Sequence, residues 1–282
     1  MTTSPSSAAQ AARERLAARL RDIRRDAGLT GAELALRCGW SPSKRSRIEN
    51  ARTPPSDADV REWCTACAAE DQAADLVAAN RQADQMYVHW KKLHRHGMSR
   101  AQAEVLPLYA GTRRFRIYCS NVVPGILQTE GYATALLSAI ARFQGTPDDA
   151  RQAAARRLER SGVLYEGDHR FAFLLEETVL RYRIGPPDTM ASQLGYLLAV
   201  MALPNVSLGV IPFDAERRVW PLEAFYLFDD RQVSSELLTA AVNVTAPGEV
   251  STYSKAFAEM SESAVYGTRA RRLITDAINT LG

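Results

Sequence analysis

Cysteine, histidine and carboxylate side chains are the residues of this 282-residue sequence that could bind a metal or catalyse a reaction. Cys64 and Cys67 form a C-x-x-C motif, which is typical of a redox pair or of half a zinc site. The sequence has no second C-x-x-C, and its histidines offer no matching ligand spacing. Trp63, Cys64 and Cys67 instead fall at helical spacing. We therefore expect a buried helix face here, and we expect no metal and no cofactor.

Two pairs of neighbouring carboxylates, Glu176-Glu177 and Asp229-Asp230, resemble the paired acids of hydrolases. Successive side chains on a strand point to opposite faces, so neither pair would share a site. We expect salt-bridged or solvated acids instead. The sequence contains no G-x-S-x-G, H-E-x-x-H or phosphate-binding glycine motif. We predict that the protein is not an enzyme.

A short basic segment, residues 41–50 (SPSKRSRIEN), points to a different chemistry. It lies in a region, residues 13–52, that carries eleven basic and five acidic residues, whereas residues 101–282 carry 18 and 20. Basic charge concentrated in one part of a chain is expected of a domain that faces a polyanion. A solvated helical face would produce the same count, so charge alone leaves both interpretations open.

The elements that must position this segment are short helices. An apolar stripe predicts a helix over 13–27, which Gly28 would end as a C-cap glycine. A T-x-x-E capping box, Thr30 to Glu33, begins a second helix that stops at Gly39. Only Gly39 and Trp40 separate this second helix from the next one, and helices joined by so short a turn are expected to cross steeply.

A third helix begins directly after that turn, because Ser41 can cap it and Pro42 fits its first position. With Ile48 facing inward, its outward residues are Ser43, Ser46, Arg47 and Asn50. Small polar residues let a helix enter the major groove, and a guanidinium can donate two hydrogen bonds to guanine. This conjunction of signals within twenty residues favours DNA binding over a solvated helical hairpin. After Ser56 we expect a fourth helix over 57–68.

Three further residues belong to the predicted DNA-binding set. Lys44 lies on the third helix, and the backbone near Thr30 and Gly31 would meet a phosphate at the start of the second helix.

Arg45 occupies a position where a small helix should bury an apolar side chain. We predict that its aliphatic stem follows the core edge while the guanidinium reaches solvent or an acid such as Glu33 or Glu49. We therefore expect Arg45→Val to raise the melting temperature of the isolated domain without abolishing DNA binding, since burying a valine-sized side chain is worth on the order of 1–2 kcal/mol.

The sequence predicts a multidomain chain: an N-terminal all-α helix-turn-helix domain and a C-terminal α+β domain with a mixed, largely antiparallel sheet. The expected divisions are a disordered tail (1–12), the helix-turn-helix domain (13–68), a helical linker (69–100) and the C-terminal domain (101–282). Expected strands are 113–120, 171–177, 206–213, 224–228 and 240–245, and expected helices are 129–142, 148–163, 188–202, 249–264 and 267–280.

Residues 13–68 resemble the XRE (lambda-repressor-like) helix-turn-helix family through the motif GLTGAELALRCGWSPSKRSRIEN. Segments such as YVHWKKLHRHG, RRFRIYCSNVVPGILQTEGYA and LPNVSLGVIPF extend the resemblance to about residues 15–281. They are similar to actinobacterial regulators, including WhiJ-like regulators of Streptomyces, in which an antitoxin-like domain of formerly unknown function follows the helix-turn-helix. The resemblance implies transcription regulation and a small protein partner encoded nearby.

The same resemblance assigns roles to individual residues. Base-reading positions fall on Pro42, Ser43 and Arg47, and a loop residue near the phosphate backbone falls on Arg52. Arg24 and Glu49 match an ion pair that joins the first and third helices.

The sequence departs from the family pattern at three places. Gly31 stands where glutamine is common, Arg45 where valine or isoleucine is usual, and Ala51 where glycine is usual after the helix.

The C-terminal domain is expected to receive an effector or partner and to help form a homodimer, because one recognition helix covers only a few base pairs. An alternative is a ligand-sensing regulator that binds a small molecule among aromatic and basic residues: Trp220, Phe225, Tyr226, Phe228, Arg217 and Arg218. The longest apolar run, 196–204, is far shorter than the roughly 20 residues of a membrane span. We expect a cytoplasmic, nucleoid-associated protein.

Overall fold

The computed structural model describes residues 5–85, 87–94, 97–245 and 247–281. The chain divides into two compact units, residues 1–88 with 241–243 and residues 89–240 with 244–282. Among the described residues, no helix is long and apolar enough to cross a membrane.

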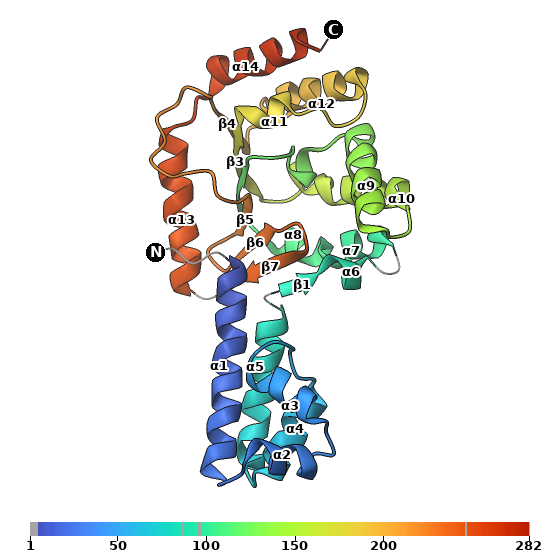
Figure 1. The fold of residues 1–282 in the computed structure, drawn as a ribbon. Coiled ribbons are helices and arrows are strands. Elements are labelled where there is room, and N and C mark those ends of the chain that lie inside the picture. Colours follow the sequence, from blue (N-terminus) through green and yellow to red (C-terminus); the bar gives the residue numbers. More distant parts are fainter. Residues whose placement is uncertain (1–4, 86, 95–96, 246, 282) are drawn as a thin grey trace. The chain divides into compact units, whose positions relative to one another are not determined.

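The N-terminal unit is helical (Figure 1). Its elements are α1 (Pro5–Asp26), α2 (Gly31–Arg37), α3 (Pro42–Glu49), α4 (Asp57–Ala66), the 3-10 turn η1 (Glu70–Gln72) and α5 (Ala73–Gln85). Leu20, Leu34 and Trp63 are fully buried at the centre of its core. The Trp63 Nε1–H donates to the Leu20 carbonyl at 2.9 Å, which ties α4 to α1.

The predicted helix starts of this unit are confirmed. Thr30 Oγ1 accepts from the Glu33 amide at 3.2 Å while the Thr30 amide donates to the Glu33 carboxylate at 2.7 Å, which completes the capping box. Ser41 caps α3 with Pro42 in its first turn. Ser56 caps α4, which ends at Ala66, two residues earlier than predicted.

Two boundaries differ from the sequence prediction. Residues 1–4 lie outside the described residues, but α1 already begins at Pro5, so the expected disordered tail is wrong for residues 5–12. Proline suits a first helical turn and the alanines that follow favour helix. The linker expected to be helical over 69–100 also contains a strand, β1 (Tyr87–His89), because an aromatic and a β-branched residue interrupt the helical pattern.

The C-terminal unit is a mixed α+β domain, as predicted. Its elements are α6 (Trp90–Leu93), α7 (Met98–Glu104), α8 (Leu106–Gly111), β2 (Arg114–Cys119), η2 (Gly125–Leu127), α9 (Glu130–Gln144), α10 (Ala150–Ser161), η3 (Gly162–Leu164), β3 (Arg170–Glu176), α11 (Glu177–Arg181), α12 (Pro187–Val200), β4 (Val206–Ile211), β5 (Phe225–Phe228), β6 (Gln232–Glu236), α13 (Pro247–Glu262) and α14 (Gly267–Asn279). Most of β7 (Ala240–Val244) is counted with the N-terminal unit.

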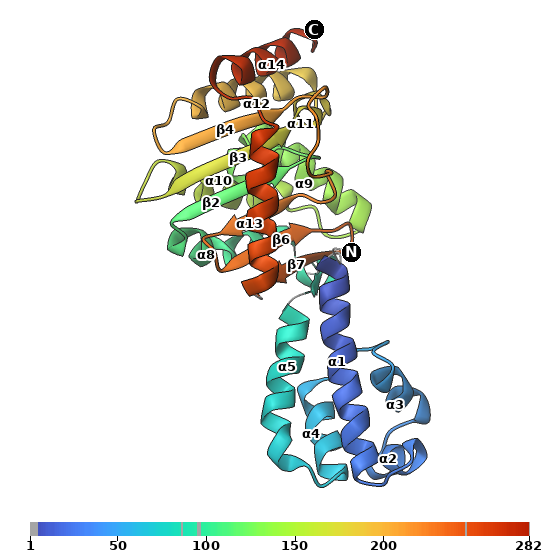
Figure 2. The same cartoon turned by 90° about the vertical axis from the view of Figure 1, so that its left-hand side faces the viewer.

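Within the C-terminal unit the sheet has the strand order β6-β5-β2-β3-β4. β2 pairs parallel with β3, and β3 pairs parallel with β4, whereas β5 runs antiparallel to both β2 and β6. One face buries Ile117 and Phe173 against α9, α12 and α14. On the other face α13 crosses the strands (Figure 2), and its Tyr253 packs edge-on against Phe225 at 5.1 Å between ring centroids.

All five predicted strands are present within one or two residues at most boundaries, because each combines β-branched or aromatic residues with flanking turn residues. β6 was not predicted. Its sequence, QVSSE, contains one buried aliphatic residue, Val233, between polar neighbours, so its strand pairing with β5 outweighs a weak local preference.

The end of α3 carries local backbone strain. The Ala51 amide donates to the Ile48 carbonyl at 3.0 Å and the Arg52 amide donates to the Arg47 carbonyl at 2.8 Å, the two hydrogen bonds of a Schellman cap. This cap requires a left-handed residue, and Ala51 supplies it at φ +52°. Glycine adopts that conformation without a clash between Cβ and backbone.

We predict that Ala51→Gly stabilises the protein by about 1 kcal/mol, because it relieves the left-handed strain. Thermal or urea unfolding of the full chain measures the change. Ala18→Gly is the matched control: Ala18 is exposed in the middle of α1, where glycine should lower stability by about 0.5–1 kcal/mol. Equal destabilisation by both substitutions would contradict the assigned strain.

Candidate nucleic-acid interface

One side of α3 is fixed to the core of the N-terminal unit. Ile48 is 2% exposed and packs in the same cluster as Leu20 and Leu34. Beside it, Glu49 is only 4% exposed although it carries a carboxylate. A buried charge is tolerated only when partners surround it.

Three arginines surround Glu49. Arg24 of α1 donates from Nε and Nη2 to Glu49 Oε1 at 2.9 and 2.7 Å, and from Nη1 to the Leu29 carbonyl at 2.6 Å. Arg21 donates to the Glu49 carbonyl at 2.7 Å. Arg45 donates to Glu49 Oε2. The structure therefore contains the Arg24–Glu49 pair that the family resemblance implied.

The electrostatic balance at Glu49 favours its charged form. Burial alone would raise the pKa of Glu49, but the hydrogen bonds and charges of Arg24 and Arg45 outweigh it and hold the pKa below its usual value. The carboxylate consequently joins Arg24 of α1 to Arg45 of α3 in one ionic network.

Arg45 also explains the glycine at position 31. Its guanidinium lies against Gly31 so closely that a Cβ built there would be 2.5 Å from Arg45 Cζ. A side chain at 31 and an arginine at 45 would therefore compete for one volume. Gly31 and Arg45 both depart from the family pattern, and the missing side chain at 31 leaves the space that the Arg45 guanidinium occupies. The expected Arg45 partner is Glu49 rather than Glu33, because Glu33 is held by Thr30.

The opposite side of α3 presents polar side chains to solvent. Ser43, Arg47 and Asn50 are exposed and Ser46 is half-buried. Arg47 Nη1 donates to Ser43 Oγ at 3.0 Å, so the guanidinium lies along the helix surface. Asn50 Nδ2 donates to the Ser46 carbonyl at 2.8 Å. The outward face predicted from the helical wheel is thus brought together.

The side chains of Lys44 and Thr30 do not belong to this exposed face of α3. The Lys44 ammonium pairs with Asp59 of α4 at 2.6 Å and lies 4.1 Å from the centre of the Trp40 ring. The Thr30 hydroxyl is engaged by Glu33 in the capping box. Both side chains therefore support the fold locally, whereas Pro42 is exposed at the start of α3.

Arg52 lies next to the outward face because of the cap at Ala51. Its amide bonds back to the Arg47 carbonyl, and its exposed side chain leaves the loop that follows α3. Arg47 and Arg52 are thus both exposed, as contacts to a base and to a phosphate would require.

The cysteine and carboxylate pairs have structural roles. Cys64 and Cys67 are buried in the N-terminal core, and this burial raises the pKa of both thiols. Glu176 accepts from Arg217 Nη1 at 2.7 Å, and Glu177 accepts from Arg181 Nη2 at 3.1 Å.

The second carboxylate pair belongs to the turn between β5 and β6. Asp230 pairs with Arg114 and Arg116, each at 2.5 Å, and Asp229 accepts from the Arg114 amide at 2.8 Å. Salt-bridged acids were predicted at both pairs. Among the described residues, no group of three or more His, Cys, Asp and Glu residues could hold a metal ion.

The structure does not gather the aromatic residues of the alternative ligand site into one pocket. Phe225 and Phe228 are buried in the core, whereas Trp220 is 58% exposed. Phe225 packs against Tyr118 and Phe228 against Tyr109, and the neighbouring position, Tyr226, stacks on Phe228. Because successive strand residues face opposite sides of the sheet, Phe225 lies on the face opposite to Tyr226 and Phe228.

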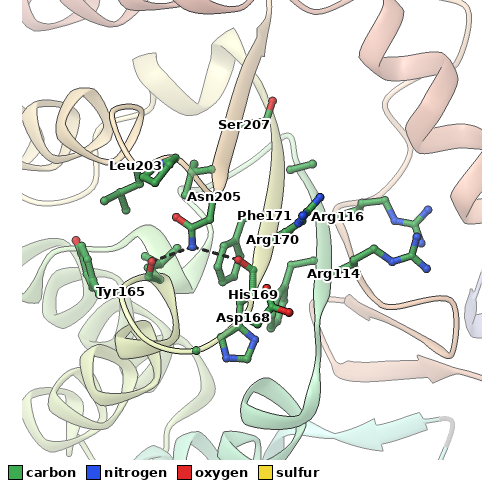
Figure 3. A pocket seen from close by; sticks show the side chains of 16 residues that line it. Arg114, Arg116, Tyr165, Asp168, His169, Arg170, Phe171, Leu203, Asn205 and Ser207 are labelled. Atoms are coloured by element: carbon green, nitrogen blue, oxygen red, sulfur yellow. Dashed lines mark hydrogen bonds between the residues drawn. The ribbon is translucent and has the colours of Figure 1, made fainter.

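An open pocket of about 950 Å³ lies elsewhere, at the N-terminal ends of β2, β3 and β4 (Figure 3). Arg114, Arg116 and Arg170 lie along one side of it, and Tyr165 and Asn205 lie on the other. Asn205 Nδ2 donates to the Leu164 and His169 carbonyls at 3.1 and 3.2 Å, which fixes the loop between them. Sequence reasoning missed this pocket because its residues come from separate strand ends.

Two family models match the chain. Residues 102–276 match a domain of unknown function (DUF5753), and residues 15–77 match a helix-turn-helix domain. Neither the curated proteins nor the solved structures gave a match.

Because Arg45 donates to Glu49, the expected gain in melting temperature for Arg45→Val is reversed. Arg45→Val would leave Glu49 Oε2 without this donor and open a space above Gly31. We predict that the substitution lowers the stability of the full chain by about 1–3 kcal/mol in urea unfolding.

The control is the same substitution in a Glu49→Gln background, where Arg45 no longer neutralises a carboxylate and its loss should cost clearly less. A higher melting temperature for Arg45→Val in the otherwise unchanged chain would show that apolar burial dominates.

Proposed function

The chain belongs to the family described as a domain of unknown function (DUF5753), and we propose that it is a sequence-specific DNA-binding transcriptional regulator. The observation that carries the proposal is the division of α3 into two sides. Ile48 and Glu49 fix one side to the core, and Ser43, Arg47 and Asn50 leave the other side polar and exposed. A rigid helix with an exposed polar face is what major-groove readout needs.

In this proposal Pro42, Ser43 and Arg47 face the base edges, with Ser46 and Asn50 beside them. The short side chains let α3 approach the groove, and the Arg47 guanidinium can donate two parallel hydrogen bonds to a guanine. The Ser43–Arg47 hydrogen bond at 3.0 Å keeps the guanidinium on this face before DNA arrives.

Arg52 and the start of α2 are proposed to contact phosphates. Arg52 extends from the loop beside the base-reading face, and the backbone at Thr30 and Gly31 lies next to the Arg45 guanidinium. The backbone amides at the start of α2 would meet a phosphate where a glutamine side chain is missing, whereas the Arg45 charge is already balanced by Glu49. Lys44 is engaged by Asp59, so we propose a supporting rather than a contacting role for it.

Binding experiments separate these roles. We predict that Arg47→Ala relaxes preference at one position of each half-site, by about 1–3 kcal/mol against a wrong base. Arg52→Ala should weaken cognate and scrambled duplexes alike and reduce the salt dependence by about one phosphate contact. The duplex would first be selected from a random library and then titrated at two salt concentrations.

Arg272→Ala is the matched control, since it removes an arginine that is 84% exposed on α14 and should leave both affinities unchanged. An unchanged cognate-to-scrambled ratio for Arg47→Ala would place base recognition on another surface.

We further propose a homodimer in which the C-terminal domain contributes much of the interface. Two recognition helices read half-sites about one turn, 34–36 Å, apart, so a dimer doubles the length of sequence that is read. We predict that light scattering at micromolar concentration gives twice the 31.1 kDa mass of the chain. A 31.1 kDa particle that pairs only on DNA would contradict the prediction.

The finer family assignment is also a proposal: an XRE-type regulator of the actinobacterial WhiJ-like kind, controlled through its antitoxin-like C-terminal domain by a small protein partner. The alternative is control by a small molecule. The open pocket beside Arg170 supports this second candidate, because it combines accessible volume with a cationic side chain, whereas Arg114 and Arg116 are paired with Asp230.

A further inference from the structure

Helix α10 carries two arginines on its buried side. Ala150, Ala153 and Ala154 are at most 2% exposed and pack with α7 and α9. Arg157 and Arg160 continue this stripe at spacings of three and four residues, so the helix turns both guanidinium groups inward. Arg160 is 8% exposed.

The partners of these two arginines are neutral. Arg157 donates from Nε to Gln102 Oε1 at 3.2 Å and from Nη1 to Gln128 Oε1 at 2.7 Å. Arg160 lies over the Tyr109 ring at 4.6 Å from its centre. Its Nε is buried and has no hydrogen-bond partner, and among the described residues no carboxylate forms an ion pair with either guanidinium.

The two guanidinium groups converge on Gly125. A Cβ at this position would lie 2.8 Å from Arg160 Nη2 and 3.5 Å from Arg157 Cδ, so a side chain here would displace the Arg160 guanidinium. The Gly125 amide donates to Tyr226 Oη at 3.4 Å. The cluster of Gly125, Arg157, Arg160 and Tyr226 is called the α10 arginine site below.

Glu236, which is exposed at the end of β6, is a carboxylate whose charge acts on Arg157, but it forms no ion pair with either guanidinium. Burial and the adjacent Arg160 lower the pKa of Arg157, and the charge of Glu236 opposes this effect. Burial raises the pKa of Tyr226, and it raises the pKa of the nearby Cys119 thiol to about 12, so both groups are uncharged. Both groups can donate a hydrogen bond to an anion, but neither carries a negative charge that would balance the arginines.

We propose that the α10 arginine site binds the oxyanion group, carboxylate or phosphate, of a small ligand. A buried guanidinium is unfavourable without a charged partner, and the buried Arg160 has an unused donor at its Nε. Arginine binds planar or tetrahedral oxyanions through paired N–H groups. The oxyanion would complete this charge balance. Any coupling to DNA rests on the proposed function, whereas oxyanion binding does not.

Thermal unfolding of the full chain tests the site, with inorganic phosphate and acetate as separate probes against chloride at constant ionic strength. A probe at about ten times its Kd should raise the melting temperature by about 3–5 °C. Arg160→Gln and Arg157→Gln should each lose at least half of this increase. Arg151→Gln, at an exposed position on the same helix, should keep it.

Two further measurements locate the bound anion at α10. Arg52→Ala should keep the full increase, which separates this site from phosphate binding beside α3. In arginine-labelled protein the Arg160 Nε–H resonance, identified by its loss in Arg160→Gln, should shift with the same Kd. Arg157→Gln need not fold for this second measurement, because the shift is followed in the unchanged chain.

The proposal is overturned if neither probe raises the melting temperature, if both α10 variants respond like the original chain, or if the Arg160 Nε–H resonance does not move.

Discussion

The buried carboxylate of Glu49 controls the geometry of the helix-turn-helix. It is 4% exposed, yet Arg24 and Arg45 keep it ionised, and Arg21 binds the carbonyl of the same residue. Each donor comes from a different place on α1 or α3, so α3 can neither rotate nor slide without breaking several charged hydrogen bonds. Breaking a buried pair leaves an uncompensated charge and is strongly unfavourable. The direction of the exposed α3 face therefore follows from an interaction on its hidden side.

The same network connects three residues that look unrelated in the sequence. Arg45 needs the space above Gly31 to reach Glu49, and Gly31 in turn leaves that part of α2 without a side chain of its own. The Schellman cap after Glu49 is held by Ala51 in a left-handed conformation. The network can tolerate this strain because the ionic contacts on one side and the cap hydrogen bonds on the other fix the chain end of α3.

Local signals in the sequence predicted the parts that depend on local physics. The capping box at Thr30 and the Ser41-Pro42 start are satisfied within four residues, so the sequence alone located α2 and α3. Strands with aromatic and β-branched residues were found for the same reason. Contacts between residues far apart in the sequence could not be predicted in this way. QVSSE became β6 through pairing, and Gly31–Arg45 required the crossing of two helices. Arg157 and Arg160 were hidden because charged residues on a helix normally face solvent.

Two pairs of arginines in this chain differ in whether a carboxylate of the same chain balances their charge. Arg24 and Arg45 converge on a carboxylate of their own chain, so their charge is used internally and adds rigidity. Arg157 and Arg160 lie one turn apart on α10 and both approach Gly125 of η2. The groups they contact are amide oxygens and an aromatic ring. Alanine or leucine would fill the same stripe of α10 without desolvating any charge. The presence of two guanidinium groups there is explained by a partner that carries the missing negative charge and enters from solution.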